Sequence, residues 1–190
     1  MKRTLSILFS VMSVLMLNAA APAGYYSSAE GKHKGSLLAA LEDIVGPHEA
    51  LAYNELWSLY RKSDVTADGY IWDMYSTSKY TPGSDQCGSY SSIGDCYNRE
   101  HSFPKSWFDD QSPMVTDAYH IYPTDGKVNG QRSNYPFGEC ANGSYVASSG
   151  SVKALGRLGT STFSGYSGKV FEPDDQYKGA FARSYFYMAA

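Results

Sequence analysis

A carboxylate and an imidazole stand side by side, as Glu100 and His101, in the stretch DCYNREHSFPKSWF, residues 95–108. Hydrolysis of a phosphodiester needs a base within hydrogen-bond reach of the attacking water and a divalent cation that neutralises charge on the phosphate. A neutral imidazole is the side chain best matched to proton transfer near pH 7, and a carboxylate is a ligand for hard cations. The pair is therefore a candidate for a metal-assisted hydrolytic centre.

A third candidate, Asn129, lies further along the chain at the start of an expected helix and offers an amide oxygen that suits Mg²⁺. Neighbours in a regular strand point to opposite faces, so Glu100 and His101 can share one centre only where the backbone bends or a second element covers them. Each residue also has an ordinary interpretation. His101 alone is more often a surface or structural histidine, Glu100 a solvated carboxylate, and the Asn129-Gly130 pair a turn.

The elements that must position these residues alternate between helix and strand patterns. Apolar spacing and end signals predict helices at residues 36–45 and 48–60, from about 127, and from about 174. Other patterns predict strands at 69–76 and 118–122, a loop at 78–96, a turn at 123–126, and weak strands with loops at 143–168. This order favours a mixed α+β fold.

The first residues predict export. Two basic residues precede an apolar run, residues 5–17, and small residues follow up to Ala23. This pattern is typical of a signal peptide, and the run is shorter than the roughly 20 residues of a membrane-spanning helix. We therefore expect residues 24–190 to form a single domain that is secreted or periplasmic, with no stable membrane association. The last predicted helix reaches Ala190 without a cap, which indicates truncation at the C-terminus.

All three cysteines lie beyond the signal peptide. In an oxidising compartment Cys87 and Cys96 are the natural pair, and closing this loop stabilises a fold by about 2.5 kcal/mol in the chain-entropy model. Cys140 is then expected to be a buried thiol. A zinc site is disfavoured, because the sequence contains no CxxC and no paired Cys/His spacing.

Net charge does not indicate a nucleic-acid ligand. The chain has 16 basic and 19 acidic residues, a charge of −3, and loses two basic residues with the signal peptide, which leaves 14 against 19, or −5. A nucleic-acid site must therefore be a local basic patch. The 17 tyrosines suit stacking on sugars or bases, although half-buried sheet positions account equally well for most of them.

Two long blocks, YNREHSFPKSWF and DAYHIYPTDGKVNGQRSNYPFGE, closely resemble the bacterial endonuclease I family of secreted and periplasmic nucleases. A later segment, FEPDDQYKGAFARSYFYM, is also similar, so the resemblance runs from about Leu37 to the end of the chain. The resemblance implies a ββα-metal, or His-Me finger, motif within the α+β fold. It also implies that His101 is the general base and that Glu100 and Asn129 bind a divalent ion, Mg²⁺ with Mn²⁺ or Ca²⁺ as alternatives.

The activity that the resemblance implies is endonucleolytic hydrolysis of DNA, and of RNA as well, with little sequence preference and with 5′-phosphate and 3′-hydroxyl products. Some relatives carry an arginine for the scissile phosphate in an insertion that is missing here, where only residues 102–116 intervene. Arg99 or Arg132 is expected to replace that arginine, and Lys127 to add a phosphate contact.

Two further polar residues, His120 and Asp117, are expected to support the centre. His120 would pack or orient the site through a hydrogen bond, and Asp117 would either brace it or cap the connecting segment. We expect a monomer. The alternatives are a Tyr-rich module that binds glycans or a cell surface without catalysis, and a metal-dependent hydrolase of another phosphoester.

Overall fold

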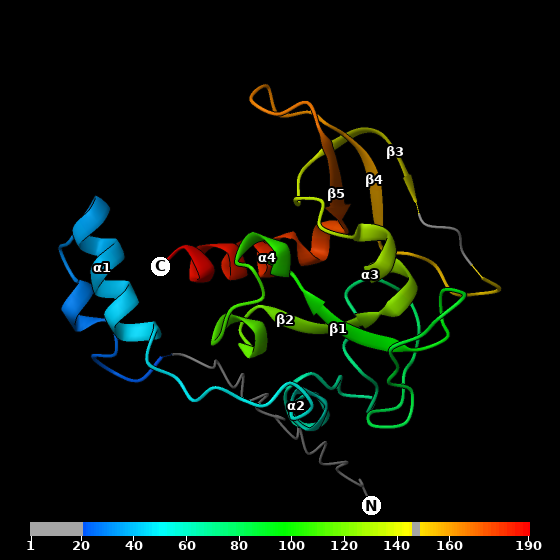
Figure 1. Ribbon diagram of the computed structural model, residues 1–190, viewed down its shortest axis with the longest axis horizontal. Helices are drawn as coiled ribbons and strands as arrows, with labels where there is room; N and C mark the ends of the chain where they lie inside the picture. The colour runs from blue at the N-terminus through cyan, green and yellow to red at the C-terminus, as the bar shows by residue number, and fades with distance from the viewer. Residues whose placement is uncertain (1–20, 146–148) are drawn as a thin grey trace, which may run out of the picture. The chain divides into compact units, whose positions relative to one another are not determined.

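The computed structural model describes residues 21–145 and 149–190 (Figure 1). The expected signal peptide, residues 1–23, lies almost wholly outside this part of the chain. The described residues form two compact units, of which the first ends at Ile44. Within them, no helix is both long and apolar enough to cross a membrane. The expectation of a single domain over residues 24–190 stays a prediction.

The first unit contains a short 3₁₀ helix, Ser27–Ala29, and the helix α1, Lys34–Val45. Helix α1 confirms the helix predicted for residues 36–45. The helix ends immediately before Gly46 and Pro47. Glycine and proline both favour termination at this point, as the sequence indicated.

The second unit is built around an antiparallel strand pair that is followed directly by a helix (Figure 1). Strand β1, Tyr97–His101, pairs with β2, Ile121–Asp125, and helix α3, Gly126–Arg132, begins at the next residue. The Asp125 carboxylate caps α3 by accepting the N–H of Val128 at 2.9 Å, which satisfies one of the free donors of the first turn. The helix predicted from residue 127 is confirmed.

Two features of this strand pair differ from expectation. The turn predicted for residues 123–126 is wrong, because β2 continues through Asp125, with Pro123 paired opposite Arg99, and α3 begins at Gly126. The connection between the strands contains two short 3₁₀ helices, Lys105–Trp107 and Met114–Thr116. No loop separates β2 from α3. Because β2 is paired with β1, this direct connection fixes the position of α3 relative to β1.

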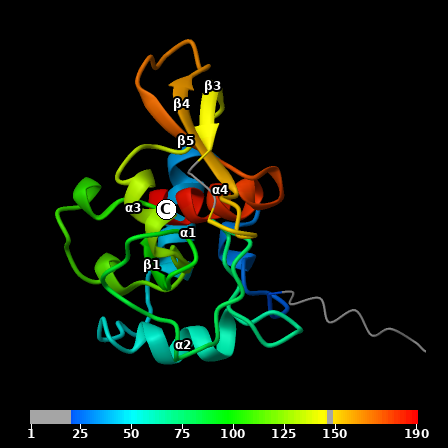
Figure 2. The same cartoon turned by 90° about the vertical axis from the view of Figure 1, so that its right-hand side faces the viewer.

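A three-stranded antiparallel sheet and a long helix complete the second unit. The sheet has the order β3-β4-β5, with β3 at Cys140–Tyr145, β4 at Gly156–Ser161 and β5 at Lys169–Pro173. Helix α4, Asp175–Ala189, follows β5, and Asp174 caps it by accepting the N–H of Gln176 at 3.1 Å. Figure 2 shows β3 and β4 side by side. The mixed α+β class is therefore confirmed, as are the short strands and the last helix.

Two hydrophobic clusters form the core of the second unit. The first joins the three-stranded sheet, α3 and α4, and its buried members are Met74, Tyr75, Ile93, Val128, Ala154, Phe171 and Phe181. The second joins helix α2, Leu56–Ser63, to β1 and β2, and its buried members are Leu56, Tyr60, Ile71, Tyr80, Tyr97 and Ile121. The strand pair and α3 are therefore each anchored by buried apolar side chains, which is what rigid positioning of polar residues on them requires.

The helix predicted for residues 48–60 is wrong in its first half. Helix α2 starts only at Leu56, because the preceding residues form a turn in which the Glu55 N–H bonds the Ala52 carbonyl at 2.8 Å. The Glu55 carboxylate in turn accepts the Ala52 N–H at 2.7 Å. A side chain that bonds its own local backbone competes with helix formation, and here the competition delays the helix.

The strand predicted for residues 69–76 is also wrong, since only isolated bridges form there. The buried Asp73 carboxylate accepts the N–H of Tyr75 at 2.8 Å and the N–H of Asp125 at 3.0 Å. In a sheet, backbone N–H groups bond to carbonyls of the neighbouring strand. Here they bond to a side-chain carboxylate instead. Burial raises the pKa of Asp73 to about 7, although its hydrogen bonds oppose the shift.

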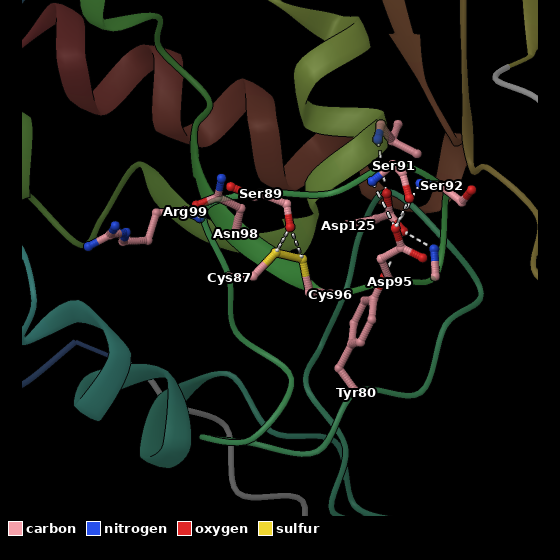
Figure 3. The surroundings of a disulfide bond; sticks show 12 residues. Tyr80, Cys87, Ser89, Ser91, Ser92, Asp95, Cys96, Asn98, Arg99 and Asp125 are labelled. Carbon is pink, nitrogen blue, oxygen red and sulfur yellow. Dashed lines mark hydrogen bonds between the residues drawn. A yellow bond between two sulfur atoms is a disulfide. The ribbon is translucent and has the colours of Figure 1, made fainter.

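The predicted disulfide links Cys87 to Cys96 immediately before β1 (Figure 3). Inside the loop that it closes, the Asp95 carboxylate accepts the N–H groups of Ser91 and Ser92, each at 2.8 Å. Cys140 is free and buried, as expected. The loop therefore has internal structure of its own, although its composition predicts no helix or strand.

A buried carboxylate on β5, Glu172, joins the three-stranded sheet to α4. It accepts hydrogen bonds from the Arg157 guanidinium on β4, the Cys140 N–H on β3 and the Lys178 ammonium on α4, with N···O distances of 3.0 Å. Burial by itself raises the pKa of a carboxyl group, but these donors outweigh burial and hold the pKa of Glu172 well below its usual range.

We expect the Glu172→Gln variant to lose about 1–3 kcal/mol of unfolding free energy at neutral pH, because charge-assisted hydrogen bonds are replaced by weaker ones. A carboxyl whose folded-state pKa is depressed stabilises the fold above its unfolded pKa of about 4.3, and this contribution is lost on acidification. The difference between wild type and variant should therefore shrink below about pH 5. Urea unfolding at several pH values measures it, and a difference that does not change with pH contradicts this account.

Candidate active site

Three residues that the sequence singles out, Glu100, His101 and Asn129, line one cavity of about 290 Å³ in the second unit. Glu100 and His101 are the last two residues of β1, and Asn129 lies in the middle of α3. The Asn129 side-chain N–H₂ donates to the Arg99 carbonyl at 3.3 Å, which holds the amide group against β1. The strand pair and the helix therefore bring together groups that are far apart in the sequence.

The Glu100 carboxylate is almost fully buried, with 2% of the residue exposed. Its Oε1 atom accepts hydrogen bonds from the Tyr75 hydroxyl and from the Arg132 guanidinium, each at 2.6 Å. Burial raises the pKa of Glu100, and the Arg132 charge opposes this shift. Among the described residues, Oε2 accepts no hydrogen bond, so one carboxylate oxygen has its lone pairs available.

The His101 imidazole is held as a neutral ring in one tautomer. Its Nε2 lies 3.1 Å from the Val115 carbonyl oxygen. A carbonyl can only accept, so Nε2 carries the proton and Nδ1 keeps a free lone pair. Burial lowers the pKa of His101 to about 4, and the ring of Tyr53 stacks on it with centroids 6.0 Å apart. At neutral pH the ring is therefore unprotonated, which is the form a general base requires.

Arg132, expected to contact phosphate, lies in the interior with 1% exposure. Its donors bond the Glu100 carboxylate and the backbone carbonyls of His101, Ser102 and Tyr135, at 2.6 to 3.0 Å. A guanidinium buried with its donors engaged in this way does not reach a phosphate in solution. Arg132 therefore lies in the interior next to the Glu100 carboxylate, and its hydrogen bonds hold that carboxylate and the end of β1 in place.

The other two cations expected at phosphate lie outside the cavity. The Arg99 guanidinium carbon is 3.7 Å from the centre of the Tyr53 ring and 4.2 Å from that of Trp57. Lys127 is half-buried on α3 and does not line the cavity. Lys105 does line it, and its ammonium pairs with Asp110 at 2.8 Å. Because both partners of that pair are exposed, the pair is weak and Lys105 can turn toward an anion.

His120 and Asp117, expected to support the centre, lie outside the cavity. His120 is fully buried, its Nε2 donates to the Met114 carbonyl at 2.7 Å, and its ring centre lies 5.7 Å from that of His101. Asp117 accepts the N–H of Tyr119 at 3.0 Å and the Tyr187 hydroxyl at 2.7 Å. Neither residue lines the cavity, so both are placed to hold the segment between β1 and β2.

The donor set of the cavity fits a hard divalent cation. The free oxygens are Glu100 Oε2 and Asn129 Oδ1, and neither accepts a hydrogen bond within the described residues. Residues 21–145 and 149–190 contain no group of three His, Cys, Asp or Glu side chains that could hold a metal. An ion here would therefore keep water or substrate oxygens as most of its ligands, which is the usual situation for protein-bound Mg²⁺.

Two tyrosines at this site carry no functional signal in the sequence. Tyr75 bonds Glu100 but lies in a segment whose alternation predicts only a strand. Tyr90, in the disulfide-closed loop, packs against the glycines of α3. An added methyl group at Gly126 would lie 2.6 Å from the Tyr90 ring, and one at Gly130 would collide with its hydroxyl. This contact fixes the turn of α3 that carries Asn129.

We expect Gly126→Ala to destabilise the protein by roughly 1–2 kcal/mol, because overpacking against Tyr90 exceeds the gain in helix propensity. The matched control is Gly88→Ala in the same loop, where an added methyl group has no neighbour within 4 Å. That control should stay within about 0.5 kcal/mol of wild type. Thermal unfolding of both variants gives the comparison, and equal stability of the two would exclude the proposed clash.

Comparisons with known proteins identify the family of this chain. The family model described as Endonuclease I matches residues 34–190. The extracellular ribonuclease of Bacillus subtilis is 33% identical over 188 residues, which cover 92% of this chain and 58% of that protein. The extracellular ribonuclease of Bacillus amyloliquefaciens is 33% identical over 172 residues, with coverage of 87% and 52%.

A further relative, endonuclease-1 of Buchnera aphidicola, is 34% identical over 75 residues, which cover 40% of this chain and 26% of that protein. The chain thus spans little more than half the length of the two ribonucleases. The family match nevertheless includes every element of the second unit, and with it β1, β2 and α3. This chain belongs to the endonuclease I family.

Proposed function

We propose that the protein is a secreted or periplasmic, divalent metal-dependent endonuclease that cuts DNA and RNA with little sequence preference. The observation that carries this proposal is the single cavity lined by Glu100, His101 and Asn129. It combines a neutral imidazole with two free hard oxygens, the minimum that metal-assisted phosphodiester hydrolysis requires. Membership of the endonuclease I family supports the same reaction class.

In the proposed mechanism, His101 Nδ1 accepts the proton of the attacking water, while the Val115 carbonyl holds the ring in the required tautomer. Glu100 Oε2 and Asn129 Oδ1 would hold the ion, Mg²⁺ first and Mn²⁺ or Ca²⁺ as alternatives. When bound, the ion neutralises charge on the phosphate and on the leaving oxygen. The water oxygen bonds to phosphorus as the P–O3′ bond breaks, and the leaving 3′-oxygen takes a proton from solvent, which gives 5′-phosphate and 3′-hydroxyl ends.

We propose the substrate range and the location from the names of the relatives and from the predicted signal peptide. Two relatives are named extracellular ribonucleases, which supports RNA as a substrate and an extracytoplasmic location, and one is named endonuclease-1. DNA is proposed from the family resemblance of the sequence. Arg99, Lys127 and Lys105 are the cations proposed to contact the phosphate backbone, a mode of binding that does not depend on sequence. We propose a monomer without stable membrane association.

The direct test is incubation of the purified protein with supercoiled plasmid and with RNA, with Mg²⁺ or with EDTA. We expect degradation of both substrates with Mg²⁺ and none with EDTA, because the ion has few protein ligands and a chelator removes it readily. Digestion that persists in EDTA would exclude the metal. If neither substrate is cut under any condition and the protein is retained on immobilised glycans, the non-catalytic glycan-binding alternative is correct.

A further inference from the structure

A second, larger cavity of about 960 Å³ adjoins the candidate active site. Asn134 lines both cavities, and its side-chain N–H₂ donates to the hydroxyl of Ser106 at 3.3 Å, which also lines the first cavity. We call the second cavity the aromatic groove, because five rings line it: Trp107, Tyr135, Phe137, Phe163 and Tyr166. A polymer held at the first cavity therefore meets the groove as it continues past Asn134.

Three of these rings are exposed to solvent, which is unusual for side chains of this size. Trp107 is 43% exposed, Phe163 70% and Tyr166 44%. Trp107 lies in the 3₁₀ helix after β1, and its ring packs edge-on against Phe103 with centroids 5.1 Å apart. Phe163 and Tyr166 lie in the connection between β4 and β5, joined by an N–H to carbonyl bond of 3.0 Å. Trp107 therefore reaches the groove from a different part of the chain than Phe163 and Tyr166 do.

The charge at the edge of the groove suits an anionic polymer. Lys169 does not line the groove, but its ammonium lies 5.1 Å from the centre of the Tyr135 ring, which does. Glu139 is the one acidic residue among the described residues that line the groove, and Lys178 pairs with it at 2.7 Å. The groove thus combines ring faces with a cation beside one of them, and its one carboxylate is paired.

We propose that the aromatic groove binds an unpaired stretch of nucleic acid next to the cleavage site, by stacking its bases on Trp107, Phe163 and Tyr166. Stacking on rings tolerates every base, and it requires bases that are not already stacked and paired in a duplex. The net negative charge of the chain also means that backbone attraction alone is weak. This inference rests on the proposed nuclease function and names its preferred substrate form: single-stranded RNA or DNA.

The test measures binding without cleavage, in EDTA, by fluorescence anisotropy of a short labelled oligothymidylate, a duplex of equal length and an abasic strand of equal length. We expect the Phe163→Ala/Tyr166→Ala variant to bind the oligothymidylate about tenfold or more weakly than wild type, since each stacked base contributes substantially. Its affinity for the duplex and for the abasic strand should change less than about twofold. The melting temperature of the variant should match that of wild type, because both rings are exposed.

The matched control is Phe186→Ala, which removes a ring that is 76% exposed on α4 and does not line the groove. This variant should bind oligothymidylate as wild type does. Equal losses in both variants, or a loss that is as large for the abasic strand, would overturn the inference. Binding of an oligosaccharide or an apolar peptide in the groove, with no effect on oligothymidylate, would also overturn it.

The outcomes separate this inference from the proposed function. If the double variant cuts plasmid normally in Mg²⁺ and binds oligothymidylate as wild type does, the groove proposal fails and the nuclease proposal stands. If wild type binds oligothymidylate through Phe163 and Tyr166 but cuts no nucleic acid, the groove is a binding site and the nuclease proposal fails.

Discussion

The His101→Ala variant is expected to cleave nucleic acid roughly 100- to 10,000-fold more slowly than wild type, the usual contribution of a general base. The reason is geometric. His101 is the neutral imidazole in the cavity, with Nε2 bound to the Val115 carbonyl and Nδ1 free to accept a proton. Plasmid and RNA cleavage rates in Mg²⁺ measure the loss. Oligonucleotide affinity in EDTA should be unchanged, because the imidazole serves the proton transfer and not the binding of substrate.

The control for this experiment is His33→Ala, which removes an exposed histidine in the first unit. It should cleave at the rate of wild type. Unfolding of the His101 variant must also be cooperative, so that its inactivity does not reflect loss of structure. If His101→Ala cuts as fast as wild type, the base lies elsewhere and the proposed mechanism is wrong.

The Arg132→Met variant is expected to lose about 3–5 kcal/mol of unfolding free energy, the cost of removing one partner of a buried ion pair. The side chains of Arg132 and Glu100 are 1% and 3% exposed, and Arg132 Nη1 lies 2.6 Å from Glu100 Oε1. Without the guanidinium, the Glu100 charge has no buried counterion, and the carbonyls at the end of β1 lose their donors. Urea unfolding measures the change, and the exposed Arg183→Met should shift it by less than about 0.5 kcal/mol.

A double variant separates charge from packing. Glu100→Gln combined with Arg132→Met removes both charges, so it should be more stable than Arg132→Met alone. The double variant should not cleave nucleic acid, because the Glu100 carboxylate that would hold the ion is absent. If the two substitutions add in full, the pair does not interact and the buried ion pair is not what stabilises this site.

The sequence predicts the centre of the second unit well, because the signals there are local. The β-prone stretch at 118–122 and the helix start at Lys127 give β2 and α3, with β2 observed at Ile121–Asp125, whereas β1 is implied only by the family resemblance. Asp125, which caps α3, also lies within a few residues of what it caps. Interactions between residues that are close in the sequence can be predicted from residue spacing and from helix and strand propensity.

Two of the errors involve contacts between distant segments. Residues 69–76 alternate like a strand, but Asp73 bonds the backbone of Asp125, which comes much later in the chain. Arginine is a residue type that commonly contacts phosphate, and only the fold shows that Arg132 pairs with a buried carboxylate instead. Residue type reveals that a charge exists, whereas burial and partner depend on tertiary packing. The aromatic groove has the same origin, since its rings come from separate segments.

Glu172 binds groups on β3, β4 and α4 at the same time, so none of these elements can separate from β5 without exposing or unpairing the same buried anion. Opening of any one of them should therefore require nearly the free energy of opening all of them. Their backbone amides are expected to exchange with deuterium as one slow group. The amide proton of Cys140, bonded directly to the carboxylate, should exchange among the last.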